Sequence, residues 1–219
     1  RRRLHVAPFG SLVAMRTVSA IIIIMASTHF TYQLWIDVRG STKLYRNIYG
    51  TLTVKRYTAP KKYGGLTHLL DGRISHGFQF RGETYRRKAT TYFVPKSGVG
   101  RMFNALPSPR KIGVMGLGVD TLASYCREND HFKFYELNPA VANVAQEEFS
   151  FLSDAPGRVE VLLGDGRMRL AGEKAQAYDG LVIDAFTGDA IPSHLLTSEA
   201  FALYLKHLKP GGILAINIS

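Results

Sequence analysis

Short apolar runs alternate with helix-like segments through the second half of the chain. The runs predict five strands, over residues 112–115, 132–136, 159–163, 181–183 and 213–218. The segments between them predict helices over residues 120–128, 140–152 and 198–208. Strands that alternate with helices indicate βαβ units and a parallel sheet. We therefore expect an α/β domain in which helices flank a parallel sheet.

The first half of the chain shows a different pattern. Residues 45–57 alternate between apolar and polar positions, as a half-buried strand does. Residues 67–80 continue this alternation on both sides of Asp71-Gly72, which is a hairpin signal. Residues 97–106 predict a short helix. We expect a β-rich subdomain over residues 45–106, followed by the α/β domain over residues 107–219.

Residues 1–44 form a basic and then apolar N-terminal segment. The apolar stretch, residues 12–26, is shorter than the ~20 residues that a membrane-spanning helix needs. It fits the end of a truncated transmembrane helix or, equally, an ordinary buried helix. No convincing signal-peptide cleavage site follows it. Because the chain begins without methionine and stops inside an apolar run, we expect a C-terminally truncated fragment of a longer protein.

Positive charge is concentrated in the front half of the chain. Residues 1–111 carry 20 Lys and Arg against 3 Asp and Glu, whereas residues 112–219 carry 8 against 14. A basic segment around an apolar one suits an anionic membrane surface, and no nucleic-acid-binding motif accompanies it. The acidic half suits a cationic substrate. The single cysteine, Cys126, excludes an internal disulfide and fits a reducing compartment.

Glycines and carboxylates follow the predicted strands, where ligands of parallel sheets bind. Gly116 and Gly118 follow the first strand, and glycine there either allows a ligand close to the backbone or simply makes a tight turn. Glu136 ends the second strand, where an acid can accept hydrogen bonds from both ribose hydroxyls. Asp165 and Gly166 follow the third strand, where an adenine amino group would need an acceptor. Together these features predict an adenosine-bearing ligand.

Two more acids lie at the end of the fourth strand. Asp184 closes it, and Asp189 lies five residues further on. Such a pair suits an amine substrate, because carboxylates hold a cation and one of them can accept a proton as the nitrogen attacks. Alternatively, Asp184 caps the following loop. His76 is a candidate for lining the site or is a plain surface histidine; no histidine has metal-ligand spacing, so no metal is expected.

Several motifs occur together in this chain. They are LLDG at 69–72, GLG at 116–118, FYELNP at 134–139, LGDG at 163–166 and VIDAF at 182–186. As a set they resemble the spermidine synthases, which are polyamine aminopropyltransferases. Residues 46–57, 90–100 and 184–212 look closer still to bacterial membrane proteins in which transmembrane helices are fused to such a domain. The resemblance covers about residues 45–219.

The resemblance implies a Rossmann-like class I methyltransferase fold that binds decarboxylated S-adenosylmethionine. It implies that Glu136 binds the ribose and Asp165 the adenine. It also implies that Asp184 accepts a proton from an amine such as putrescine, and that Tyr92 contacts this substrate. In the family an aspartate after the first strand binds the amino group of the donor. Here Asp120 stands one position later and is the candidate; its position also suits a cap for the helix that follows.

Departures from the family pattern leave other functions open. Val119 occupies the place of the donor-binding aspartate, which favours an S-adenosylmethionine-dependent methyltransferase as an alternative. A non-catalytic nucleoside-binding domain of a membrane protein is another. Thr187 takes the place of the second acid, so that Asp189 is expected to grip the amine. The expected partners are a polyamine, the membrane and a second copy in a homodimer, and the expected location is the bacterial cytoplasmic membrane with the catalytic domain in the cytoplasm.

Overall fold

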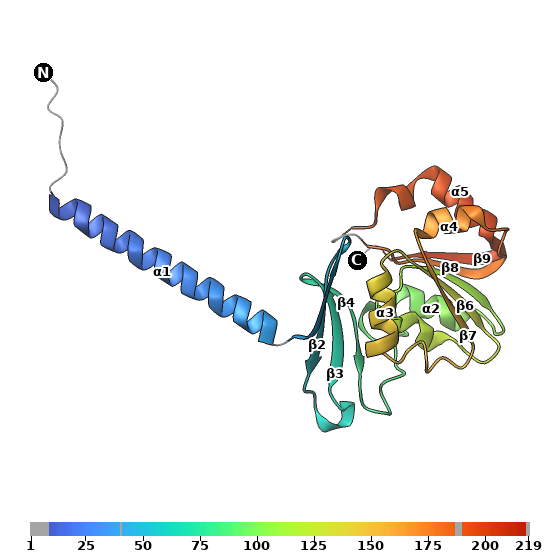
Figure 1. Cartoon of the computed structure of the whole chain (residues 1–219). Coiled ribbons are helices and arrows are strands. Elements are labelled where there is room, and N and C mark those ends of the chain that lie inside the picture. The colour runs from blue at the N-terminus through green and yellow to red at the C-terminus, as the bar shows by residue number, and fades with distance from the viewer. Residues whose placement is uncertain (1–8, 40, 187–189, 218–219) are drawn as a thin grey trace, which may run out of the picture. The chain divides into compact units, whose positions relative to one another are not determined.

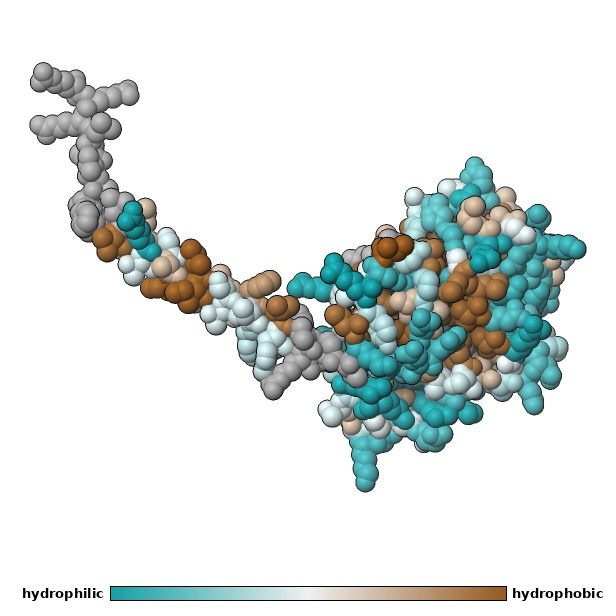
Figure 2. Space-filling model, in the orientation of Figure 1, coloured by the Kyte–Doolittle hydropathy of each residue, from teal (hydrophilic) through white to brown (hydrophobic). Residues whose placement is uncertain are grey.

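The computed structural model describes residues 9–39, 41–186 and 190–217. The chain divides into two compact units between residues 41 and 42. The first unit is a long helix, α1 (Phe9–Arg39; Figure 1). Its segment Val13–Trp35 is long and apolar enough to cross a membrane, and none of it is buried (Figure 2). A core helix of a soluble protein and a signal sequence pass the same test of length and composition.

The second unit begins with a four-stranded sheet in which the strands follow one another in chain order. Its strands are β1 (Ser41–Asn47), β2 (Gly50–Tyr57), β3 (Leu66–Asp71) and β4 (Ile74–Phe80). The pairs β2–β3 and β3–β4 are antiparallel. The predicted hairpin is confirmed, with Gly72 between β3 and β4 at a φ of +56°.

The single strand predicted over residues 45–57 is wrong, because the chain turns at Ile48 and Tyr49. The side chain of Asn47 accepts a hydrogen bond of 2.9 Å from the backbone N–H of Tyr49. Asparagine favours such turns because its side chain substitutes for a backbone acceptor. Two neighbouring strands, β1 and β2, result.

The remainder of the second unit is built on a five-stranded parallel sheet. Its strands are β5 (Lys111–Met115), β6 (His131–Glu136), β7 (Arg158–Leu163), β8 (Tyr178–Ile183) and β9 (Leu208–Ile216). The order is β7-β6-β5-β8-β9, and all four strand pairs are parallel. The chain runs outward from β5 in one direction and from β8 in the other. The crevice beyond the carboxyl ends of β5 and β8 is therefore the topological switch point, where ligands bind in such sheets.

Helices and the four-stranded sheet β1–β4, called the front sheet below, cover the two faces of the parallel sheet. The helices are α2 (Gly98–Ala105), α3 (Pro139–Glu148), α4 (Gly166–Gly172) and α5 (Ser198–His207). One apolar cluster joins α2, α3 and the front sheet to buried side chains such as Val114 and Phe134. A second cluster joins α4 and α5 to the opposite face, through Leu170 and Tyr204. The predicted α/β fold with a preceding β-rich part is confirmed.

Two predicted helices need correction, and one observed helix was not predicted. The helix over residues 120–128 is only a 3₁₀ helix, η3 (Thr121–Tyr125). Asp120 has a left-handed φ of +64° and its side chain caps nothing, so an α-helix cannot begin there. Helix α3 ends at Glu148, before residue 152. Helix α4 was not predicted.

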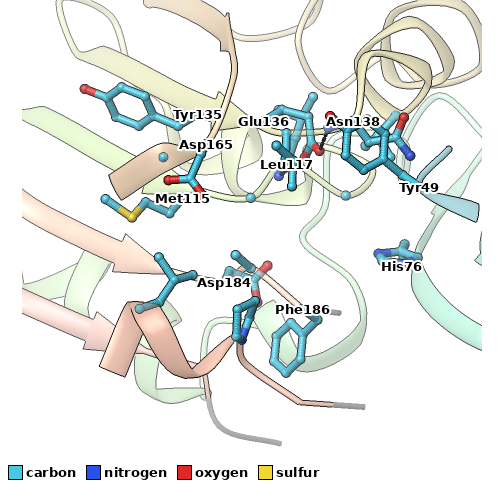
Figure 3. Close-up of a pocket in the computed structure, with 18 of the residues that line it drawn as sticks. Tyr49, His76, Met115, Leu117, Tyr135, Glu136, Asn138, Asp165, Asp184 and Phe186 are labelled. Atoms are coloured by element: carbon cyan, nitrogen blue, oxygen red, sulfur yellow. Dashed lines mark hydrogen bonds between the residues drawn. The ribbon is translucent and has the colours of Figure 1, made fainter. Parts of the chain in front are cut away.

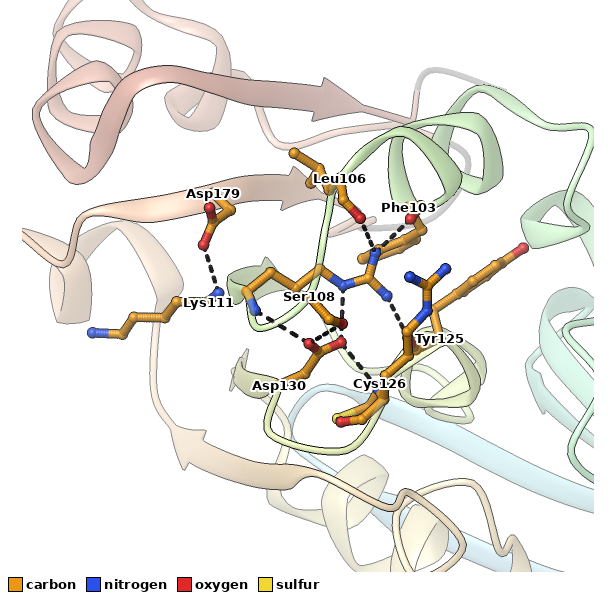
Figure 4. Close-up of polar contacts among 10 residues, drawn as sticks. Phe103, Leu106, Ser108, Lys111, Tyr125, Cys126, Asp130 and Asp179 are labelled. Atoms are coloured by element: carbon orange, nitrogen blue, oxygen red, sulfur yellow. Dashed lines mark hydrogen bonds and ion pairs between the residues drawn. The ribbon is translucent and has the colours of Figure 1, made fainter.

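A buried ion pair explains why the chain leaves the helical path after η3. Arg110 donates to Asp130 at 2.9 Å, and both side chains are completely buried (Figure 4). Asp130 also accepts hydrogen bonds from the Ser108 hydroxyl (2.6 Å) and from the backbone N–H of Arg127 (3.0 Å). Because the Arg127 N–H bonds to this carboxylate, it is not available to continue a helix. The pair thereby ties the start of β5 to the turn before β6.

Candidate functional site

A pocket lies at the carboxyl ends of β5, β6 and β8 and is closed on one side by the front sheet (Figure 3). Eight of the ten residues predicted for the site line it. They are His76, Tyr92, Gly116, Gly118, Glu136, Asp165, Gly166 and Asp184. Asp120 does not line the pocket, and Asp189 lies outside the described residues.

The two glycines of the loop after β5 are required by close backbone contacts. Gly116 has a φ of +96°, and a Cβ atom there would lie 2.2 Å from the carbonyl oxygen of Asp184. Gly118 has a φ of +57°, and its Cβ would lie 3.0 Å from the carbonyl oxygen of His76. The loop therefore makes a tight turn and also lines the pocket. The sequence left open whether these glycines form a turn or let a ligand approach the backbone, and both are compatible with this position.

Glu136 is held in the pocket by backbone groups. One carboxylate oxygen accepts from the backbone N–H of Leu117 (3.0 Å) and the other from that of Asn138 (2.7 Å). Burial raises the pKa of Glu136, and the backbone hydrogen bonds oppose that rise. Each carboxylate oxygen has a second lone pair, so two acceptors remain for a pair of vicinal hydroxyl groups.

Asp165 is the N-cap of α4 and also faces the pocket. One of its oxygens accepts from the backbone N–H of Met168 (2.9 Å). The other lies 3.2 Å from Nε2 of His194. His194 comes from the 3₁₀ helix η4 (Ser193–Leu196) and lines the same pocket. The sequence marked Asp165, but no local pattern indicated that His194 would reach it.

Asp184, in the pocket wall, has a strongly raised pKa. Burial raises its pKa to about 7, although the side-chain amide of Asn217 donates to it at 2.7 Å. The pKa of Tyr92 is raised as well, first by burial and then by the negative charge of Asp184. A carboxyl group with a near-neutral pKa can both accept and release a proton near pH 7. This is the property expected of a general base.

Asp120 lies outside the pocket lining, and its side chain does not cap the 3₁₀ helix that follows it. Its side chain is completely buried, and neither carboxylate oxygen has a hydrogen-bond partner within the described parts of the chain. Burial, assisted by the charge of Glu136, raises the pKa of Asp120 well above its ordinary value. Burial therefore disfavours the ionised form of Asp120.

The front sheet contributes residues that the sequence did not mark as site residues. Tyr49, from the turn between β1 and β2, and Asp71, from the end of β3, both line the pocket. Asp71 belongs to the LLDG motif, which could have indicated it. Tyr49 is placed by the turn that the strand prediction missed. Asn138 and Phe186 also line the wall, at the ends of β6 and β8.

The pocket has a strongly negative wall. Four carboxylates line it, those of Asp71, Glu136, Asp165 and Asp184, whereas none of the described lining residues is Lys or Arg. The two lining histidines, His76 and His194, are the only basic side chains among them. Because charged walls raise the local concentration of counter-ions, the pocket favours cationic ligands over anionic ones.

No family model matches the chain. It is 34% identical over 130 residues to a polyamine aminopropyltransferase from Vibrio vulnificus. This match covers 57% of this chain and 42% of that protein. It is 27% identical over 115 residues to putrescine N-methyltransferase 2 from Nicotiana attenuata. This match covers 50% of this chain and 31% of that protein. The chain thus spans less than half the length of the curated relatives that it matches. The resemblance to polyamine aminopropyltransferases that the motifs indicated is confirmed.

A solved structure shows the same architecture. The crystal structure of a probable spermidine synthase from Corynebacterium glutamicum superposes with a TM-score of 0.65. The match covers 80% of this chain and 63% of the other, at 19% sequence identity. This likeness confirms the Rossmann-like methyltransferase fold.

Proposed function

We propose that this chain is the nucleoside-binding and catalytic part of an aminopropyltransferase that acts on a polyamine. The observation that carries the proposal is the charge of the pocket, which four carboxylates and no Lys or Arg line among the described residues. Decarboxylated S-adenosylmethionine carries a sulfonium and an ammonium group, and a polyamine carries further ammonium groups. S-Adenosylmethionine itself would bring a carboxylate into this negative site. The similarity to polyamine aminopropyltransferases supports the same assignment.

The nucleoside end of the pocket is assigned to three elements. Glu136 would accept hydrogen bonds from the ribose hydroxyls through its two free lone pairs. Asp165 would accept one from the adenine amino group, with Gly166 leaving room beside it. The loop with Gly116 and Gly118 would pass under the sulfur-bearing carbon chain.

Asp184 is assigned as the base. The neutral amine of the acceptor attacks the carbon next to the sulfonium, a C–N bond forms and the C–S bond breaks. The electron pair of that bond neutralises the sulfur, which leaves as a thioether. The nitrogen then carries one proton too many, and the Asp184 carboxylate accepts it. The pKa of Asp184, about 7, suits this transfer. Asp189, which lies outside the described residues, remains predicted to hold the amine.

Methyl transfer to a polyamine is the second candidate. It is favoured by the similarity to putrescine N-methyltransferases and by the position of Asp120, which is buried away from the pocket. An acid placed to bind the free amine of the decarboxylated donor is therefore absent from the loop after β5 in the described structure. Either reaction uses the same nucleoside contacts and the same base.

Calorimetric titration of the full chain with the two donors separates these candidates, because the donors differ by one carboxylate. Decarboxylated S-adenosylmethionine is expected to bind at least tenfold more tightly, which corresponds to about 1.4 kcal/mol. A preference for S-adenosylmethionine would assign methyl transfer. Binding of neither nucleoside would refute both enzymatic assignments and leave a domain without this ligand.

Helix α1 is proposed as a membrane anchor, with the catalytic unit in the bacterial cytoplasm. Its apolar segment Val13–Trp35 has the length for one crossing, and basic residues dominate the segment that follows it in sequence. Cell fractionation tests this assignment: the chain should sediment with membranes and resist extraction by high salt. Release into the soluble fraction would contradict it.

A further inference from the structure

We propose that Asp71, together with the ring of Tyr49, forms a subsite for the distal ammonium group of a diamine acceptor. This inference rests on the proposed function, because it identifies where the end of the acceptor that does not react would bind. It assigns a role to a carboxylate for which the sequence indicated none.

The position of Asp71 places this carboxylate at one end of the pocket. Tyr49 and His76, from the same sheet, lie at the end of the pocket opposite Asp165 (Figure 3). Asp71 is in contact with the turn that carries Tyr49, because a Cβ atom on Gly50 would lie 2.9 Å from its Oδ1. If Asp165 binds the adenine, Asp71 lies at the far end, where the acceptor would extend.

The charge of Asp71 is unmatched in the described structure. Residues 42–111 carry 15 Lys and Arg but only 2 acids, Asp71 and Glu83. Despite these cations, the one ion-pair partner of Asp71 among the described residues is His76, whose Nε2 lies 3.9 Å away. Burial lowers the pKa of His76, so its ring is neutral at pH 7.5. Among the residues that the structure describes, none donates a hydrogen bond to the Asp71 carboxylate.

The neighbouring ring of Tyr49 completes a site for an alkylammonium group. Tyr49 lines the pocket and is 44% exposed. An aromatic face attracts an ammonium group, and a carboxylate beside it supplies the opposite charge. A second ammonium group, at the reacting end, would meet Asp184. The two acids thus select an acceptor with an amine at each end over a monoamine.

Titration of amines into the full chain saturated with methylthioadenosine, the nucleoside product, tests the subsite. Putrescine and n-butylamine are compared at pH 8, since they differ only in the distal amine. Asp71→Asn should weaken putrescine binding at least tenfold and change n-butylamine binding less than twofold. Glu83→Gln, which removes the other acid of this region, should change neither. Tyr49→Leu, at an exposed turn, should weaken putrescine binding severalfold and serves if Asp71→Asn does not fold.

The outcomes separate this inference from the proposed reaction. Unchanged putrescine binding in Asp71→Asn, or an equal loss for both amines, would overturn the subsite. No putrescine binding by the unmodified chain would overturn it too. Putrescine binding that depends on Asp71 in a chain that transfers no aminopropyl group would support the subsite and refute the reaction.

Discussion

Replacing Asp184 by Asn tests whether the ionised Asp184 carboxylate destabilises the folded protein. Burial raises the pKa of Asp184 from 3.8 to about 7. Between these values the native state holds a proton that the unfolded state has released, so the stability of the native state falls as pH rises through this window. Above pH 7 the full loss in the free energy of unfolding is present. At about 1.4 kcal/mol for each tenfold change in the ionisation constant, it amounts to about 4 kcal/mol.

The asparagine variant removes this cost and retains the acceptor for the Asn217 amide, which donates to Asp184 at 2.7 Å. We therefore expect Asp184→Asn to stabilise the protein by about 2 kcal/mol at pH 5 and about 4 kcal/mol at pH 8.5. It should also abolish turnover, since an amide accepts no proton from the amine.

The assay is urea unfolding of the full chain in detergent, followed by circular dichroism at pH 5, 7 and 8.5. Glu83→Gln, whose parent side chain is 83% exposed, should show a change within about 0.5 kcal/mol at every pH. A stability gain for Asp184→Asn that does not grow with pH would refute the reasoning. A loss of stability at pH 8.5 would refute it as well.

Three further predictions follow from contacts in the parallel-sheet domain. If ionised Asp184 is the base, kcat/KM should rise about eightfold between pH 6 and pH 7.5, as expected for a pKa of about 7. Initial rates measured across this range check this, and a flat profile would contradict the role. Asp130→Ala leaves Arg110 buried without its counter-charge and should cost about 3–5 kcal/mol in urea unfolding; a loss below 1 kcal/mol would show that the pair is dispensable. Gly116→Ala places a Cβ atom 2.2 Å from the Asp184 carbonyl oxygen and should weaken nucleoside binding at least tenfold by calorimetry, whereas Gly172→Ala, with nothing within 4 Å, should not.

The strands of the parallel sheet could be located because each contains a short apolar run. Only residues 181–183 of β8 (Tyr178–Ile183) were predicted, because Asp179 and Gly180 interrupt its apolar pattern. Strand β9 begins at Leu208, five residues before the predicted start, because Pro210-Gly211-Gly212 resembles a break. Helix α4 was missed because it is short and buries only Leu170, which leaves no helical apolar pattern. The false helix after β5 has the opposite cause: its apolar residues are real, but the left-handed Asp120 prevents an α-helical start.

The candidate site was predictable only where a residue's position in its own strand decides its role. Glu136, Asp165 and Asp184 follow strands whose carboxyl ends meet in any parallel sheet, so local sequence places them together. Asp71 and His194 reach the pocket through packing between elements far apart in the chain. Such contacts have no local pattern.

The pocket draws its two ends from different sheets. The parallel sheet provides Glu136 and Asp165, whereas the front sheet provides Tyr49 and Asp71. The two sheets have separate strand ladders, so residues at one end can change without disturbing hydrogen bonds at the other. Under the proposed function, a library confined to residues 47–50 and 71–76 is thus expected to vary the acceptor while preserving the donor.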